Sequence, residues 1–218
     1  MHLTQQAALS ARSVLKGLRL GGVTVIVGAG AMGRIHVDLA LSCRPRAIVI
    51  TDLIGGRLEL VESLFGARAA GLGIALYTVN PSVSDVKGLI GELTEHHGAD
   101  DVIVAVGSRQ AIENAQSLVG RGGVLNLFGG LKKGEDIIGL DTTLVHYKEI
   151  NVTGSSGGSP WDVARALELM AAGEINAALH ITRIGDLKHA IDLLKMVKGI
   201  RGASPCGYSL VTDITPKA

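Results

Sequence analysis

This 218-residue sequence has few aromatic residues, two cysteines and almost no net charge. Aromatics make up 3% of the residues, so the core must be built mainly from Val, Ile, Leu and Ala. The two cysteines, Cys43 and Cys206, stand far apart and form no metal-ligand spacing, which favours a reduced, cytoplasmic protein. A formal net charge of +1 gives no electrostatic reason to expect nucleic acid or a membrane surface as a partner.

Long apolar runs are missing as well. No run approaches the roughly 18 residues that a membrane-spanning helix needs. The N-terminal segment MHLTQQAALSARSVLKG lacks the continuous apolar stretch of a signal peptide. The sequence is otherwise 47% hydrophobic and 19% charged, which is typical of a globular chain with one large domain. Its glycines stand singly at the ends of expected elements, so neither collagen nor disorder is indicated.

Short apolar runs alternate with helical patterns from Val23 onward. This alternation implies crossover connections and therefore a parallel sheet. We predict an α/β fold, a Rossmann doubly wound six-stranded parallel sheet with helices on both faces. The expected strands are Val23–Val27, Ala47–Thr51, Ala75–Val79, Asp101–Ala105, Gly123–Leu127 and Ile150–Thr153.

The chain is expected to divide into three parts. Residues 1–20 place their apolar side chains on one helical face and form a lead-in helix. Residues 21–200 form the Rossmann domain, and residues 201–218 form a return strand, at Cys206–Val211, and a tail.

Two local patterns predict where helices begin. Ser82 and Asp85 have the spacing of a capping box. Ser159 precedes Pro160, a residue favoured at the first position of a helix.

The first glycine-rich turn has the pattern of a dinucleotide-binding site. The strand Val23–Val27 enters it, and Gly28, Gly30 and Gly33 form a GxGxxG motif that opens a helix. Gly28 permits the tight turn, Gly30 lets the backbone approach a pyrophosphate, and Gly33 lets the helix pack on the strand. Asp52 follows about 20 residues further on, where an acid would bind ribose hydroxyls and repel a 2′-phosphate. The pattern therefore favours NAD over NADP.

Three further small-residue turns follow later strands. Ligands of doubly wound sheets bind beyond the carboxyl ends of the strands, so these turns fall on the same edge as the first glycine turn. Each alone is typical of an ordinary turn, but the three together favour contact with the nicotinamide half of a cofactor. The turns are Gly107-Ser108, Gly129-Gly130 and Gly154–Gly158.

A longer set of motifs carries a family resemblance. The segments GAGAMG, TD, GADDVIVAVGS, GGVLNLFGGL and LDTTLVHYKEINVTGSSG occur in this order, followed by a helix after SPWD. Together they resemble the zinc-dependent medium-chain dehydrogenases, most closely the sorbitol/iditol and threonine dehydrogenase branch. The resemblance covers about residues 5–211 and implies an oxidoreductase that uses NAD and a polyol or secondary alcohol.

The resemblance also implies roles for individual residues. Those that would line the pyrophosphate are Gly28, Gly30, Ala31, Met32 and Gly33. Asp52 would hold the adenosine ribose, and Arg57 could lie along the adenine side. The residues facing the span from adenosine to nicotinamide would be Val106, Gly107, Ser108, Phe128, Gly129 and Gly130. Ser155 and Ser156 would lie near the nicotinamide, and Ile150–Thr153 would be the edge strand of a homodimer.

Members of this family carry a catalytic domain with Cys, His and Glu zinc ligands ahead of the nucleotide-binding part. This chain starts at about the lead-in helix, so we expect that domain to be absent or supplied by a partner chain. The catalytic residues are therefore unknown, no metal ligands are assigned, and the chain is expected to be the NAD(H)-binding portion of a dehydrogenase, not competent alone. The alternative is a non-catalytic NAD(H)-binding sensor or interaction module.

Two other details bear on the site. A self-sufficient short-chain dehydrogenase would need Tyr-x-x-x-Lys, and none of Tyr77, Tyr147 and Tyr208 has that lysine. His36 lies just inside the helix after the glycine turn. It is interpreted as a packing or solvent-facing residue, with a cofactor contact left open because the pyrophosphate edge is close.

Overall fold

The computed structural model describes residues 21–181, 183–186, 188, 190–191 and 210–213. The expected lead-in helix, residues 1–20, lies outside the described residues, as do residues 206–209 of the expected return strand.

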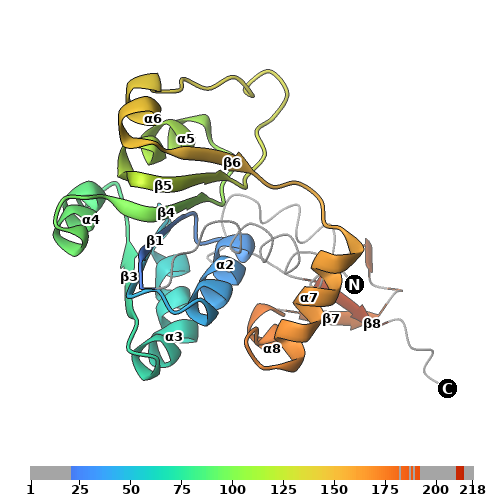
Figure 1. Ribbon diagram of the computed structural model, residues 1–218. Helices are drawn as coiled ribbons and strands as arrows, with labels where there is room; N and C mark the ends of the chain where they lie inside the picture. Colours follow the sequence, from blue (N-terminus) through green and yellow to red (C-terminus); the bar gives the residue numbers. More distant parts are fainter. Residues whose placement is uncertain (1–20, 182, 187, 189, 192–209, 214–218) are drawn as a thin grey trace.

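Six parallel strands form the central sheet in the order β3-β2-β1-β4-β5-β6, shown in Figure 1. This is the order of a doubly wound dinucleotide-binding sheet, and it confirms the predicted fold class. The strands are β1 (Val23–Val27), β2 (Ala47–Thr51), β3 (Ala75–Val79), β4 (Ala99–Val104), β5 (Val119–Leu127) and β6 (Asn151–Gly154). The bounds of β1, β2 and β3 agree with the prediction.

The strand β5 begins earlier than the sequence suggested. The predicted start is Gly123, but Val119 already pairs with Ala99 of β4, ahead of a shift in register. The backbones meet there, since a Cβ on Gly98 would lie 2.7 Å from the Gly120 Cα. These glycines therefore permit close strand packing rather than ending the strand.

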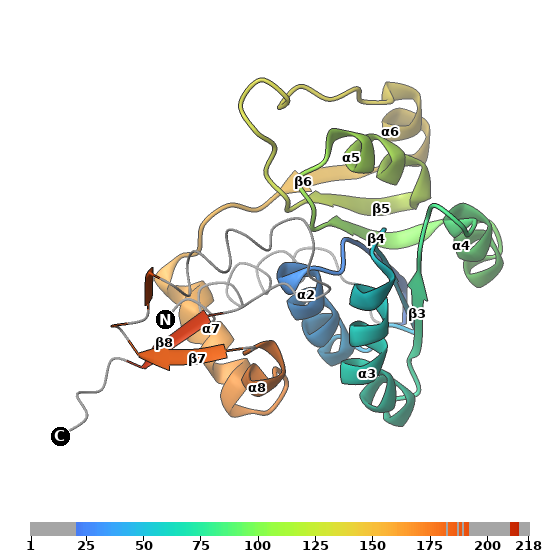
Figure 2. The same cartoon turned by 180° about the vertical axis from the view of Figure 1, so that it is seen from behind.

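Helices cover both faces of the sheet, as the two opposite views show (Figures 1 and 2). Side chains alternate along each strand, so β1 directs Val23 and Val25 into one core cluster and Ile26 into another. The first cluster packs against α4 (Val86–Thr94), α5 (Arg109–Ala115) and α6 (Thr142–Lys148). The other face carries α2 (Ala31–Ser42), α3 (Gly55–Gly71) and α7 (Pro160–Ala171).

One of the two predicted helix starts is confirmed and the other is wrong. Ser159 and Asp162 form a capping box at α7, with Pro160 in the first turn. At α4 the N-cap is Asp85 itself, which accepts a hydrogen bond from the Gly88 amide. Ser82 takes no part, because its amide and hydroxyl both bond to Asn80 Oδ1, at 2.9 and 2.6 Å.

After α7 the chain forms α8 (Ala177–His180) and a small separate sheet of β7 (Arg183–Asp186) and β8 (Leu210–Asp213), which pair in parallel. β8 overlaps the end of the expected return strand, whereas β7 was not predicted. Within the described residues, no helix is both long and apolar enough to cross a membrane.

A buried ionic network attaches α8 to the Rossmann core. Asp38 of α2 is fully buried and forms an ion pair with Arg68 of α3. Its other carboxylate oxygen lies 2.8 Å from His180 Nε2 and accepts a hydrogen bond of 3.1 Å from the Asn176 amide. Because buried charges are stable only when paired and hydrogen-bonded, this network fixes α8 against α2 and α3.

Candidate dinucleotide site

The turn between β1 and α2 depends on glycine at two positions. Gly28 has φ +104°, which favours glycine, and its amide bonds to the Thr51 carbonyl of β2. A Cβ on Gly33 would lie 1.8 Å from the Gly28 carbonyl oxygen, so the helix could not pack at this distance with any other residue. Both residues are required by the shape of the turn itself.

Gly30 has a different environment. It is the N-cap of α2 in an extended conformation, with φ −67° and ψ −170°, and makes no side-chain cap. A Cβ added there would meet no described atom within 4 Å. Among the described residues the turn therefore leaves space at the N-terminus of α2, where the first amides of a helix lack intrahelical partners and the helix dipole favours an anion.

Asp52, at the end of β2, is held in place by the glycine turn and by its own loop. One carboxylate oxygen accepts hydrogen bonds from the Ala29 amide at 2.8 Å and from Arg57 at 3.3 Å. The other accepts from the Ile54 amide at 2.9 Å. The carboxylate is thus preorganised beside the turn, and it forms an ion pair with Arg57.

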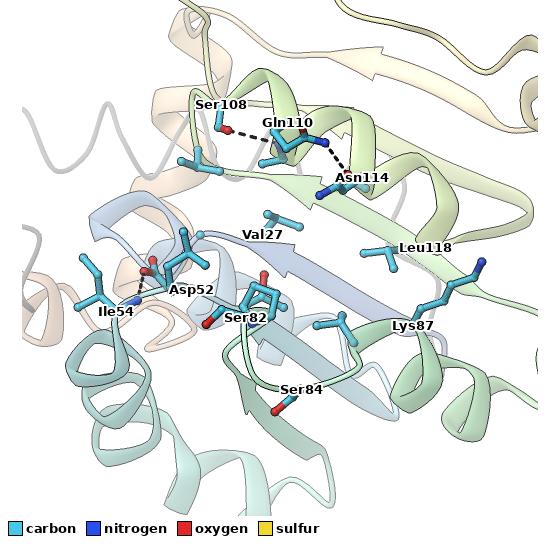
Figure 3. A pocket seen from close by; sticks show the side chains of 18 of the residues that line it. Val27, Asp52, Ile54, Ser82, Ser84, Lys87, Ser108, Gln110, Asn114 and Leu118 are labelled. Atoms are coloured by element: carbon cyan, nitrogen blue, oxygen red, sulfur yellow. Dashed lines mark hydrogen bonds between the residues drawn. The ribbon is translucent and has the colours of Figure 1, made fainter.

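A cavity of about 710 Å³ begins at this carboxylate and passes between α4 and α5 (Figure 3). Its volume lies in the range of small-molecule and cofactor sites. Its polar lining comes from Asp52 after β2, from Arg57 of α3, from the turn before α4 and the start of α4, and from one face of α5. The labelled members in Figure 3 include Ser82, Ser84, Lys87, Gln110 and Asn114.

The cavity brings together five of the predicted site residues: Gly28, Asp52, Arg57, Val106 and Ser108. The remaining predicted residues do not line it: Gly30, Ala31, Met32, Gly33, Gly107, Phe128, Gly129, Gly130, Ser155 and Ser156. Sequence reasoning missed the cavity wall formed by residues 81–87 and 110–118. Only the strand order, which places β3 beside β2 and β4 beside β1, could have indicated it.

The turns after β4 and β5 pack backbone to backbone. A Cβ on Gly107 would lie 2.4 Å from the Gly130 carbonyl oxygen, and one on Gly129 would lie 2.4 Å from the Val106 carbonyl carbon. Packing between the turns is therefore sufficient to require glycine at 107 and 129. Gly130, by contrast, faces no described atom within 4 Å of its would-be Cβ and is open like Gly30.

Ser108 and the serines after β6 differ in their surroundings. Ser108 caps α5 by accepting a hydrogen bond from the Ala111 amide. Ser155 Oγ is buried without a partner among the residues described, whereas Ser156 is exposed.

His36 of α2 lies behind the glycine turn. Its ring is fully buried, its Nδ1 is 2.8 Å from the Met32 carbonyl oxygen, and its centroid is 4.5 Å from that of Phe128 in an edge-to-face contact. Burial lowers the pKa of His36 to about 4, although the bond to Met32 opposes the shift. The packing interpretation of His36 is thus correct, and its packing partners are two of the predicted site residues.

The described residues do not provide a zinc site. Among them, no three His, Cys, Asp or Glu side chains are grouped so as to hold a metal ion. Cys43 is half-buried beside α2, and burial raises the pKa of its thiol, which disfavours the thiolate that a metal would need. The parts of the chain in the structure fit a dinucleotide and do not fit a catalytic zinc.

This fold and this edge of the sheet define a dinucleotide-binding domain of the dehydrogenase type. Residues 31–172 match the family model described as zinc-binding dehydrogenase, and the chain belongs to that family.

Two curated proteins are similar to this chain over most of its length. The chain is 37% identical over 179 residues to mannitol-1-phosphate 5-dehydrogenase of Aliivibrio fischeri, covering 80% of this chain and 42% of that protein. It is 29% identical over 196 residues to L-sorbose 1-phosphate reductase of Klebsiella pneumoniae, covering 88% and 47%. The chain therefore spans about half the length of the curated relatives that it matches.

Among solved structures, 2R,3R-butanediol dehydrogenase from Bacillus subtilis is similar, with a TM-score of 0.81 at 20% identity. The match covers 98% of this chain and 57% of that one. At this identity the likeness concerns the fold.

Proposed function

We propose that this chain is the NAD(H)-binding portion of a zinc-type alcohol or polyol dehydrogenase. The observation that carries the proposal is the open backbone at Gly30, at the N-terminus of α2, next to a cavity that contains the preorganised Asp52 carboxylate. The pyrophosphate would lie at Gly30 and the adenosine in the cavity, with Leu53 and Val106 as exposed apolar side chains for the adenine. The nicotinamide half would extend toward Gly130.

Cofactor choice follows from the charge beside the ribose position. Asp52 supplies a carboxylate that can bind ribose hydroxyls and repel a 2′-phosphate. Arg57 is engaged by this carboxylate at 3.3 Å, which lowers its availability to a phosphate. We therefore propose NAD rather than NADP as the cofactor.

The binding test is a calorimetric titration of the chain with NADH and NADPH, using two glycine variants. Gly30→Ala keeps an accessible backbone conformation but fills the space proposed for the pyrophosphate, so NADH affinity should fall by at least about tenfold. Gly71→Ala is the matched control, because Gly71 also faces no described atom within 4 Å but ends α3. Wild-type protein that binds neither nucleotide, or equal affinities of the two variants for NADH, would contradict the proposal.

The substrate proposal rests on the relatives. Two of them are named for phosphorylated six-carbon substrates, so we propose a polyol or a polyol phosphate as the substrate class. Hydride transfer would require zinc from sequence outside the described residues or from a partner chain, because these residues do not provide its ligands. Polyol-dependent formation of NADH should appear only when the sequence or partner chain that supplies the zinc site is present.

The remaining parts of the proposal concern organisation and location. We propose that residues 21–200 form the NAD-binding domain, flanked by a lead-in helix and a return strand, in a cytoplasmic enzyme. The strand β6 ends the sheet order, and its Val152 is 40% exposed, which supports a homodimer through that edge. A non-catalytic NAD(H) sensor is the alternative, since the described residues hold no group of metal ligands, and NADH-dependent oligomerisation without turnover would support it.

A further inference from the structure

The buried histidine of α2 connects a segment at the proposed pyrophosphate position with a segment that leads toward the proposed nicotinamide position. His36 approaches the Met32 carbonyl through Nδ1 at 2.8 Å, and Met32 belongs to the first turn of α2. The same ring meets Phe128, the residue that follows β5, at 4.5 Å with an interplanar angle of 83°. One side chain thus contacts both the start of a helix and the end of a strand.

The protonation state of this ring follows from its partner. A carbonyl oxygen only accepts hydrogen bonds, so Nδ1 must carry the hydrogen and donate it to Met32. Burial keeps the ring neutral near pH 7, since the pKa of His36 is lowered to about 4. Nε2 is then a lone-pair acceptor, and it has no hydrogen-bond partner in the described part of the chain.

An aliphatic residue would fill this position without burying an unpaired acceptor. A buried polar atom without a partner is unfavourable, so the polar function of this ring needs an explanation. Its one hydrogen bond and its one aromatic contact both lead to residues at the edge where the proposed site lies. Near these residues are Gly30 and Gly130, the two site glycines with open space in front of them.

We propose that His36 is a positioning residue for the nicotinamide half of the cofactor. By binding the Met32 carbonyl and packing against Phe128, it holds the first turn of α2 and the end of β5 in one fixed arrangement. The inference rests on the proposed function, because it assumes that a dinucleotide spans Gly30 and Gly130. It adds a residue that acts from behind the site and that does not touch the ligand.

The test compares two ligands that share the adenosine and pyrophosphate but differ in the nicotinamide: NADH and ADP-ribose. His36→Phe retains an aromatic ring against Phe128 but cannot donate to Met32. It should weaken NADH by about fivefold, the size expected for one lost hydrogen bond, and ADP-ribose by clearly less, because ADP-ribose lacks the nicotinamide that lies beyond the pyrophosphate. His36→Asn keeps a donor near the Nδ1 position and should recover most of the NADH affinity.

A matched control comes from a histidine with the same local bond away from the site. His97 Nδ1 lies 2.9 Å from the Thr94 carbonyl oxygen, just after α4. His97→Phe removes that bond and should leave both affinities unchanged. If His36→Phe does not fold, His36→Leu repeats the comparison, because its smaller side chain cannot overpack the position.

The outcomes separate this inference from the proposed function. A wild-type chain that binds neither ligand refutes the dinucleotide site. A wild-type chain that binds both, with His36 variants that lose neither or lose both equally, refutes the positioning role and leaves His36 as core packing. Selective loss of NADH in His36→Phe, with recovery in His36→Asn, supports it.

Discussion

Lowering the pH from 7 to 5 should destabilise this protein through His36 specifically. The pKa of this buried ring falls from 6.5 to about 4 on folding, because burial penalises the charged form. The unfolded chain therefore binds the proton more readily than the folded one. The stability held by the neutral ring is complete above about pH 6.5 and is lost progressively as the pH falls toward 4.

The magnitude follows from the distance below the unfolded pKa. A pH of 5 lies about 1.5 units below the pKa of the unfolded imidazole, which is then mostly protonated, whereas the folded ring is still mostly neutral. This difference corresponds to about 2 kcal/mol of unfolding free energy. The other shifted groups act outside this window. The pKa of Glu113 is lowered by its bond to the Gly139 amide, and that of the Cys43 thiol is raised by burial.

The assay is urea unfolding at pH 7 and pH 5 of wild-type protein and His36→Phe. All other titrating groups are common to the two proteins, so the difference between their two pH-dependent losses isolates position 36. Wild type should lose about 2 kcal/mol more than the variant. Equal losses in both proteins would show that His36 is accessible to protons in the folded state, and the assignment of a buried neutral ring would be wrong.

Three further changes test other parts of the structure. Asp38→Asn removes the carboxylate shared by Arg68, His180 and the Asn176 amide and should cost about 2 kcal/mol in urea unfolding, because Arg68 keeps its bond to the Glu174 carbonyl; a loss below about 1 kcal/mol would contradict the buried network. Asp52→Asn weakens the hydrogen bond from the Ala29 amide and removes the negative charge at this position. Calorimetry should therefore show a lower affinity for NADH and a smaller ratio of NADH affinity to NADPH affinity. Unchanged selectivity would remove Asp52 from the site. The proposed homodimer through β6 predicts that the wild type elutes as a dimer and Val152→Asp as a monomer in gel filtration, and a variant dimer that persists would exclude the β6 edge.

The strands could be read from the sequence because both faces of the sheet are covered. A strand buried on both sides must be apolar throughout, so β1 and β2 appear as continuous runs such as Val-Thr-Val-Ile-Val, with clear ends. The start of β5 could not be read in this way. Its glycines serve close packing against Gly98, and the sequence does not distinguish that use from a turn.

The candidate site was predictable only where a motif encodes it. Gly28 and Asp52 belong to the spacing of glycines and acid that predicts a dinucleotide site, whereas Lys87 and Asn114 reach the cavity because the sheet order brings α4 and α5 together. The role of His36 depends on a contact with Phe128, a residue far along the chain. Such contacts arise from tertiary packing and leave no periodic signal in the sequence.

The glycines of the site divide into two classes that a motif does not separate. Gly33 and Gly129 are fixed by the fold, since a Cβ on either would lie within 2.5 Å of another backbone segment. Gly30 and Gly130 have no such constraint, and alanine would fit the folded chain at both positions. Residues that folding does not require to be glycine, at the edge where a doubly wound sheet binds its ligand, are best explained by the close approach of a ligand to the backbone. In the proposed function, Gly30 and Gly130 are therefore the glycines at which the dinucleotide would approach the backbone.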